Sequence, residues 1–196
     1  MLDMNRELKE MIEGLADADP RKRANSAGII CVQWVAAACS AIMKWLEDEE
    51  LNRLIGGKER KVTVGIAVNR EQFAKIRAAN GMPRLADVPA DQDAEEFEVQ
   101  FENGDSLDIL TSRAPGGDGA IAKYLAKFGE GVQQVEFRCG DVDRATTILK
   151  ERLGVKAVYP ETRAGADGTK INFFLVAAPE EGKVLIELYE SREKSS

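Results

Sequence analysis

The chain has 196 residues, of which 44% are hydrophobic and 31% are charged, and its formal net charge at pH 7 is −7. This length and balance fit a folded protein with one domain of ordinary size plus an appendage, or with two small domains. The negative charge argues against nonspecific nucleic-acid binding, which needs a positive surface facing phosphate. The chain contains no histidine, so a metal site built on imidazole is excluded.

The three cysteines, Cys31, Cys39 and Cys139, show no spacing typical of metal ligands. Cys31 and Cys39 fall in a predicted helix, too far apart along its axis to form a disulfide. We therefore expect free thiols in a reducing compartment. Because charged residues occur from Asp3 onward, we expect no signal peptide and a cytoplasmic protein.

Residues 1–57 are predicted to form an all-helical extension. Apolar side chains recur at helical spacing over residues 4–16. Asp19-Pro20 has the pattern of an N-cap followed by proline in the first helical turn. A long helix is expected from there to about Asp48, with further turns up to Gly56-Gly57, which end it.

Ser26 to Met43 carry no charged residue, and the run is long enough to raise the question of a membrane span. Its alanines, serines and glutamine make insertion into a bilayer weak, so no membrane association is expected. Trp34, Ala38 and Trp45 lie on one helical face. We expect this face, with Ile29, to pack on another subunit and make a homo-oligomer. Packing on the remaining domain, or covering its cleft, is the alternative.

The pattern changes after Lys61 from helical spacing to alternation of apolar with polar or small side chains, which predicts strands with one buried face. Asn103-Gly104-Asp105 has the composition of a hairpin turn. The predicted elements of this first module are, in chain order, a strand at 62–68, a helix at 71–80 capped by Gly81, strands at 97–101 and 106–109, and a helix at 120–128.

The same order then repeats, since Val64 to Val68 has a counterpart in Val135 to Cys139. The repeat predicts an α+β fold in which two βαβββ modules form a curved eight-stranded sheet with a cleft inside. The predicted elements of the second module are a strand at 134–139, a helix at 141–153 ended by Gly154, and strands at 155–159, 171–177 and 183–189.

Three stretches carry a resemblance to a known family: Val64 to Val68 (VGIAV), Gly119 to Phe137 (GAIAKYLAKFGEGVQQVEF), and Gly165 to Glu190, which contains KVLIELYE. In them the chain resembles the vicinal oxygen chelate superfamily, also called the glyoxalase fold, and within it the methylmalonyl-CoA epimerases. The resemblance covers residues 61–190. The resulting organisation is a helical extension at 1–57, a linker at 58–60, a glyoxalase-type domain at 61–190 with modules at about 61–113 and 131–190, and a tail at 191–196.

The resemblance implies a divalent metal in the cleft, held by one residue from each of four strands. These ligands are typically two histidines, a glutamine or glutamate, and a glutamate, and the metal stabilises the enolate of a bound thioester. Position by position, the ligands fall on Thr63, Asp108, Gln134 and Glu187. Only Glu187 matches outright, and Asp108 is a shortened substitute. The site is thus vestigial, and we expect no metal or other cofactor, with Mg²⁺, Mn²⁺ or Ca²⁺ on oxygen ligands as the alternative.

Alternation along the strands independently puts these four positions on the polar faces of their strands. A buried carboxylate needs a partner, so Glu187 is expected to pair with Arg138 or to accept a hydrogen bond from Gln134. The candidate site consists of a ligand cleft lined by Thr63, Gln134, Arg138 and Tyr189, with Glu187, Glu136 and Asp108 as candidate catalytic carboxylates.

Two hypotheses about function follow. In the first, the chain is a glyoxalase-fold protein with a degenerate metal site that binds a small molecule or acts as a structural or interaction component. In the second, it is an epimerase or isomerase resembling methylmalonyl-CoA epimerase, whose carboxylates transfer a proton on an acyl-CoA or related carboxylate. The absence of histidine favours the first hypothesis. The epimerase-like sequence at residues 119–137 and around Glu187 favours the second.

Overall fold

The structure of the protein is a computed structural model that describes residues 2–56, 60–102, 104–178 and 182–191. It divides into two compact units. The first unit comprises residues 1–34 and 63–133, and the second comprises residues 35–62 and 134–196. Four sequence predictions fall wholly or partly outside the described residues: the helix stop at Gly57, the linker at 58–60, the turn at Asn103 and the tail at 191–196.

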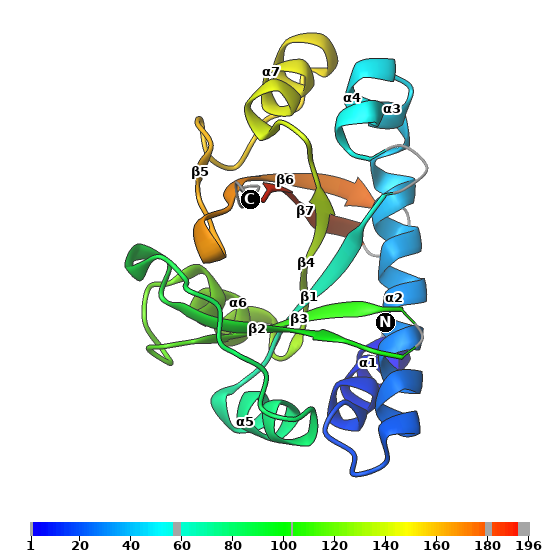
Figure 1. Ribbon diagram of the computed structural model, residues 1–196, viewed down its shortest axis with the longest axis vertical. Helices are drawn as coiled ribbons and strands as arrows, with labels where there is room; N and C mark the ends of the chain where they lie inside the picture. The colour runs from blue at the N-terminus through cyan, green and yellow to red at the C-terminus, as the bar shows by residue number, and fades with distance from the viewer. Residues whose placement is uncertain (1, 57–59, 103, 179–181, 192–196) are drawn as a thin grey trace, which may run out of the picture. The chain divides into compact units, whose positions relative to one another are not determined.

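The first unit contains three described strands with helices beside them (Figure 1). Strand β1 pairs in parallel with β3, and β3 pairs antiparallel with β2, which gives the order β2-β3-β1. Its elements are α1 (Leu2–Gly14), the N-terminal part of α2 (Pro20–Ala41), β1 (Val62–Ala67), α5 (Arg70–Ala79), the 3₁₀ helix η2 (Ala90–Gln92), β2 (Ala94–Gln100), β3 (Ser106–Ser112) and α6 (Ala120–Phe128).

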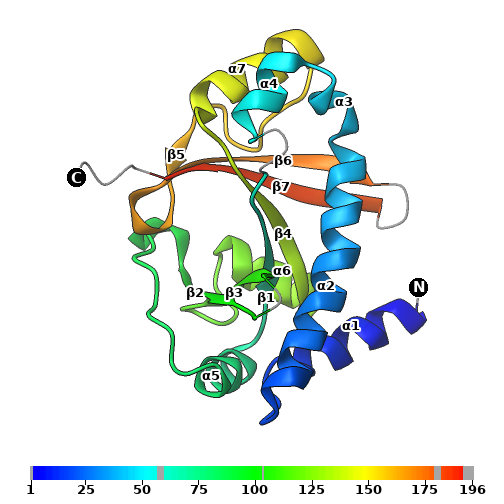
Figure 2. The same ribbon diagram turned by 45° about the vertical axis from the view of Figure 1, so that its right-hand side comes forward.

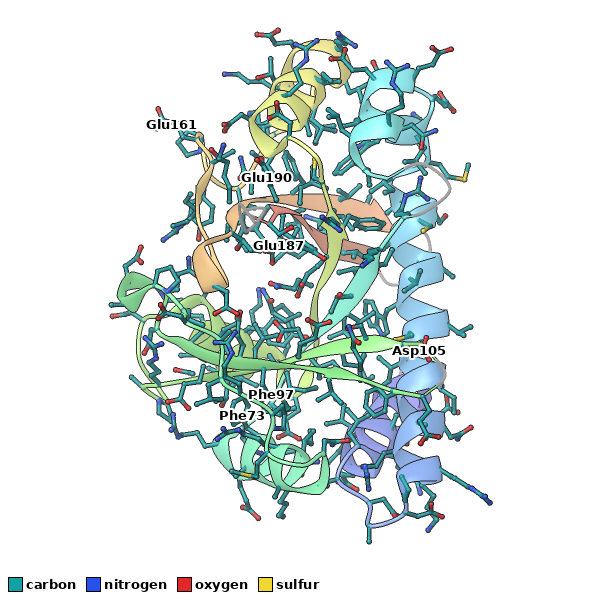
Figure 3. All side chains as sticks on the ribbon, in the orientation of Figure 1. Phe73, Phe97, Asp105, Glu161, Glu187 and Glu190 are labelled. Carbon is teal, nitrogen blue, oxygen red and sulfur yellow. The ribbon has the colours of Figure 1, made fainter. Side chains whose placement is uncertain are left out.

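One face of this three-stranded group is apolar and buried. Ile66, Ile109 and Phe97 are each 0% exposed. Phe73 of α5 packs edge-on against Phe97 of β2, with their ring centroids 4.8 Å apart (Figure 3). Because alternate side chains of a strand point to opposite faces, this packing puts Thr63 of β1 and Asp108 of β3 on the other face.

The N-terminal helices of the first unit are tied to α5 by hydrogen bonds. The Gln72 side chain donates to the Ile12 carbonyl at 3.1 Å, and the Asn80 side chain donates to the Leu15 carbonyl at 3.1 Å. Arg23 of α2 donates in turn to Asn80 Oδ1 at 3.1 Å. The beginning of the helical extension is therefore an integral part of the first unit.

The second unit contains four described strands. Strand β4 pairs in parallel with β7, β7 pairs antiparallel with β6, and β6 pairs antiparallel with β5, in the order β4-β7-β6-β5. Its elements are the C-terminal part of α2, α3 (Met43–Leu46), α4 (Glu49–Leu54), most of β4 (Gly131–Arg138), α7 (Val142–Leu153), β5 (Arg163–Ala164), the 3₁₀ helix η3 (Ala166–Gly168), β6 (Lys170–Ala178) and β7 (Gly182–Glu190).

The predicted α+β fold with N-terminal helices is confirmed, but the described residues form seven strands and not eight. In the first module, the described residues between α5 and β2 include Pro83 and Pro89, which lack the N–H that a strand ladder needs. The strand expected at 155–159 is also wrong. These described residues are irregular, Pro160 follows them, and the short β5 forms further along the chain.

The long helix expected to run to about Asp48 ends at Ala41 instead. Ile42 leaves the helical region, with φ −96° and ψ 9°. Asp48 then begins α4 by accepting hydrogen bonds from the backbone N–H groups of Glu50 and Leu51, at 3.1 and 3.0 Å. An aspartate in this position stabilises the start of a new helix. A helix therefore begins after Asp48, where the sequence predicted that helical turns simply continue.

Part of the face predicted to pack on another subunit is buried within the second unit. Ala38 is 0% exposed and Trp45 is 3% exposed. The Trp45 ring packs edge-on against Phe174 of β6, with the centroids 5.5 Å apart. Burying these two side chains therefore requires no second subunit. Ile29 is 46% exposed, and the homo-oligomer itself stays a prediction.

Helix α2 is long and apolar enough to cross a membrane by length and composition, with a mean hydropathy of 1.3 over its most apolar window. Among the described helices it is the one that meets this criterion. The criterion is weak evidence, because a core helix of a soluble protein also satisfies it.

Helices α4 and α7 lie side by side (Figure 2) and are joined by charged hydrogen bonds. Arg144 Nε and Arg152 Nη2 donate to the Glu50 carboxylate at 2.6 and 2.8 Å, and Arg152 also donates to Asp48 at 3.0 Å. These hydrogen bonds from two guanidinium groups lower the pKa of Glu50 from 4.5 to about 2.

We expect Glu50→Gln to lower stability at neutral pH and to have little effect near pH 2. The folded-state pKa lies below the unfolded value, so the carboxylate stabilises the fold above pH 4.5. This contribution is lost as the pH falls through about 2. Urea unfolding of wild type and variant across this pH range measures the difference. Glu49→Gln, in the same helical turn, is the control, and an equal loss in both variants would contradict the assignment.

We expect Trp45→Ala to lower the free energy of unfolding by about 3–5 kcal/mol, the usual cost of truncating a buried tryptophan. Because the contact with Phe174 is made within one chain, the loss should be the same at low and high protein concentration. Denaturant unfolding at two concentrations tests this. Val32→Ala, at a position 74% exposed, should cost less than about 0.5 kcal/mol. A loss that depends on concentration would instead place Trp45 in a subunit contact.

Candidate functional site

The second unit brings three of the predicted site residues together on the polar face of its strands. Gln134 and Glu136 belong to β4 and are two residues apart, so they share a face. Glu187 of β7 is the register partner of Glu136 and is labelled in Figure 3. Gln134 is 6% exposed and Glu187 is 8% exposed, while Glu136 is half-buried.

The side-chain amide of Gln134 bridges the two carboxylates. Its Nε2 donates to Glu187 Oε2 at 2.6 Å and to Glu136 Oε1 at 3.0 Å. An amide nitrogen carries two hydrogens, so both are used. In the reverse orientation the amide oxygen would face two carboxylates and be repelled by them. This repulsion determines which way the amide is oriented. Of the two partners expected for Glu187, the structure forms the hydrogen bond with Gln134.

The strand sequences explain this placement. Val135 and Phe137 of β4, and Ile186 and Leu188 of β7, are each 0% exposed. These apolar side chains occupy the opposite face of the two strands, where burial from water stabilises them. The pleat then fixes Gln134, Glu136 and Glu187 on the other face.

Arg138 and Tyr189 lie on the same face as the carboxylates. They are register partners, two residues beyond Glu136 and Glu187 along their strands, which corresponds to about 7 Å. Arg138 is exposed and Tyr189 is half-buried. The structure therefore places a guanidinium and a phenol next along the face, as the alternation predicts.

Phe173 also belongs to this face, although it was not predicted as a site residue from the sequence. It is the register partner of Glu187 on β6. Tyr159 packs edge-on against it with centroids 6.0 Å apart, and the Arg163 guanidinium lies 4.6 Å from the Tyr159 ring centroid. The adjacent Phe173 and Phe174 could have revealed it, because neighbouring residues of a strand must point to opposite faces. The polar face thus has an aromatic edge beside the carboxylates.

In the first unit, Thr63 and Asp108 share the polar face of β1 and β3. Both are 8% exposed, and Asp108 is the register partner of Gly65, two residues after Thr63. The strand pairing repeats that of the second unit, so Thr63 corresponds to Gln134, Gly65 to Glu136, and Asp108 to Glu187. The expectation that all four vestigial positions face one cleft concerns both units and stays a prediction.

With the Gln134 amide oriented as in the structure, the donor set of the second unit does not fit a metal ion. The Gln134 amide turns its hydrogens, and not its oxygen, toward the two carboxylates, and a cation between them would meet N–H groups. In the described part of the chain, no three His, Cys, Asp or Glu side chains are grouped as metal ligands. Burial raises the pKa of Cys31 to about 12 and that of Cys139 to about 11, so both are neutral thiols at neutral pH.

We expect Gln134→Met to lower the free energy of unfolding by about 2–3 kcal/mol, because two carboxylates on paired strands lose their shared donor. Part of this loss should disappear in the background of Glu136→Gln, which removes one of the two charges. Unfolding free energies of the two single variants and the double variant give the coupling energy, expected to be about 1 kcal/mol. Additive effects would show that the amide does not bridge the carboxylates.

Solved structures similar to this chain include methylmalonyl-CoA epimerases. The enzyme from Mycobacterium tuberculosis is 29% identical, with a TM-score of 0.55, over 67% of this chain and 87% of that one. A Streptomyces coelicolor methylmalonyl-CoA epimerase in complex with 2-nitronate-propionyl-CoA is 28% identical, with a TM-score of 0.52, over 66% of this chain and 95% of that one.

A hypothetical protein from Bacillus halodurans C-125 shares the fold at 21% identity, with a TM-score of 0.56, over 71% of this chain and 99% of that one. No protein-family model matches the sequence, and no curated protein matches it. The repeated strand pairing and these similarities agree, and we conclude that the chain has the vicinal oxygen chelate fold and is similar to the methylmalonyl-CoA epimerases within that superfamily.

Proposed function

We propose that this protein binds a small molecule on the polar face of its second unit and that it does so without a metal ion. The observation that supports this most directly is the bridge from the Gln134 amide to Glu136 and Glu187. By resemblance, a metal ligand is expected at Gln134. Here that position supplies N–H donors to the neighbouring carboxylates. These donors stabilise the two negative charges, as a bound cation would otherwise do.

The side chains on this face define the chemistry of the ligand. Glu136 and Glu187 supply carboxylates, Arg138 supplies a guanidinium, Tyr189 supplies a phenol and Phe173 supplies an apolar ring. Such a combination suits a small molecule that has an apolar part together with an uncharged carbonyl group, the typical lining of a small-molecule site. An acyl thioester fits this description.

A second candidate function is proton transfer of the epimerase type. It is favoured by the 28–29% identity with methylmalonyl-CoA epimerases and by the pair of carboxylates. One carboxylate would remove the proton from the carbon next to the thioester carbonyl, leaving an enolate, and a proton returned to the opposite face would invert that carbon. The enolate oxygen needs a positive partner. We assign this role to Arg138, a cationic side chain on this face.

Electrostatics makes binding the first of the two proposals. Both hydrogens of the Gln134 amide already point at carboxylates, so the amide does not serve as an electrophile for an enolate. An enolate formed beside Glu136 and Glu187 would add a third negative charge to the same face, which is unfavourable at short range. Turnover would therefore depend on Arg138, whose exposed position weakens its field through solvent screening.

The two proposals are separated by incubating the chelator-treated protein with methylmalonyl-CoA in D₂O. Calorimetry measures binding, and mass spectrometry measures deuterium at the α-carbon. Binding without deuterium uptake supports the first proposal. Deuterium uptake that persists in the presence of chelator and falls at least tenfold in Glu187→Gln supports the second proposal. Glu98→Gln on β2 is the matched control. Absence of binding would exclude this ligand class, and binding or uptake restored only by added metal would overturn both proposals.

A further inference from the structure

We propose that Gln134 is a built-in substitute for a cation, and that this one amide is what keeps the carboxylates of Glu136 and Glu187 from forming a divalent-cation site. The inference rests on the proposed function, since it concerns the same face. Gln134 is then the positioning residue that fixes the electrostatic state of that face.

The geometry of the bridge supports this role. Glu136 and Glu187 are register partners on parallel strands, where like charges repel. One oxygen of each carboxylate lies within 3.0 Å of the same nitrogen atom. Two carboxylate oxygens that converge on a single point are the arrangement that hard cations such as Ca²⁺ and Mn²⁺ require of their ligands. The side-chain N–H groups of Gln134 lie at this point of convergence.

The comparison between the two units argues that the amide and the second carboxylate belong together. At the level of Asp108, strand β1 has Gly65, whereas at the level of Glu187, strand β4 has Glu136. The residue two positions earlier is Thr63 in the first unit and Gln134 in the second. A bridging amide is thus present in the strand pair that has two facing carboxylates. The strand pair that has a single carboxylate carries a hydroxyl group in the same position.

An ordinary buried hydrogen bond is the competing explanation, and it makes a different prediction. If Gln134 merely satisfies its neighbours, then Gln134→Glu should only destabilise the protein. If Gln134 substitutes for a cation, the same change brings a third carboxylate to the point of convergence, and the full-length protein should gain a site for one divalent cation.

The test uses chelator-treated full-length wild type, Gln134→Glu, and Gln100→Glu as the matched control. Gln100 is an exposed residue of β2 whose amide donates to Glu98 at 3.4 Å, so the control makes the same chemical change beside a carboxylate outside the site. Calorimetric titration with CaCl₂ and MnCl₂ should show one cation per chain in Gln134→Glu, at least tenfold tighter than in wild type or control. The melting temperature of Gln134→Glu should rise with added cation, and the melting temperatures of wild type and Gln100→Glu should not.

A second variant keeps the inference testable if Gln134→Glu fails to fold. Gln134→His adds no negative charge and supplies an imidazole nitrogen beside two carboxylates, a donor set that suits Co²⁺. We expect a visible absorption band when this variant is titrated with Co²⁺, and no band with wild type. A folded Gln134→His without the band, or a folded Gln134→Glu that binds cations no better than the control, would overturn the inference. Stoichiometric cation binding by wild type would overturn both this inference and the proposed metal-independent function, whereas the two preceding outcomes would overturn the inference alone.

Discussion

In both units the first strand pairs in parallel with the last, and this constraint decides which residues share the polar face. Parallel neighbours cannot be joined by a tight turn, so each pair needs a crossover, which here includes α5 in the first unit and α7 in the second. Each helix covers apolar side chains on one face of its strands. The residues on the opposite face are then fixed in register, with Asp108 beside Gly65 and Glu187 beside Glu136.

Much of this arrangement can be predicted from alternation, because the apolar side of each strand is unambiguous. Val135 and Phe137 must share a face, so Gln134 and Glu136 must share the other. Alternation does not reveal hydrogen bonds between strands. The bridge from Gln134 to Glu187 depends on the register of β4 against β7, which is a property of the assembled strands and not of either sequence alone.

The predictions that failed did so where local signals compete. Ile42 interrupts α2 without glycine or proline and α3 follows it directly, while Asp48 caps the separate helix α4 a few residues later. Residues 155–159 alternate like a strand but precede Pro160, and they join β6 through the hydrogen bond from the Val158 N–H to the Phe173 carbonyl at 2.7 Å instead of through a strand ladder. The subunit contact expected of the Trp45 face is untested, because sequence periodicity shows that a face is apolar but does not show what covers it. Phe174 of the same unit covers it here.

Replacing a cation by an amide changes what a carboxylate pair can do. A bound cation supplies positive charge that can move toward a developing enolate oxygen, whereas the Gln134 amide carries only partial charges, and both of its hydrogens are directed at Glu136 and Glu187. The amide has a compensating property, because its presence depends on neither cation concentration nor a chelator. In this proposal, the exchange stabilises the arrangement of the face while removing its main source of electrophilic assistance. A face of this kind is better suited to recognising a ligand through fixed acceptors than to stabilising a negative charge that appears during a reaction.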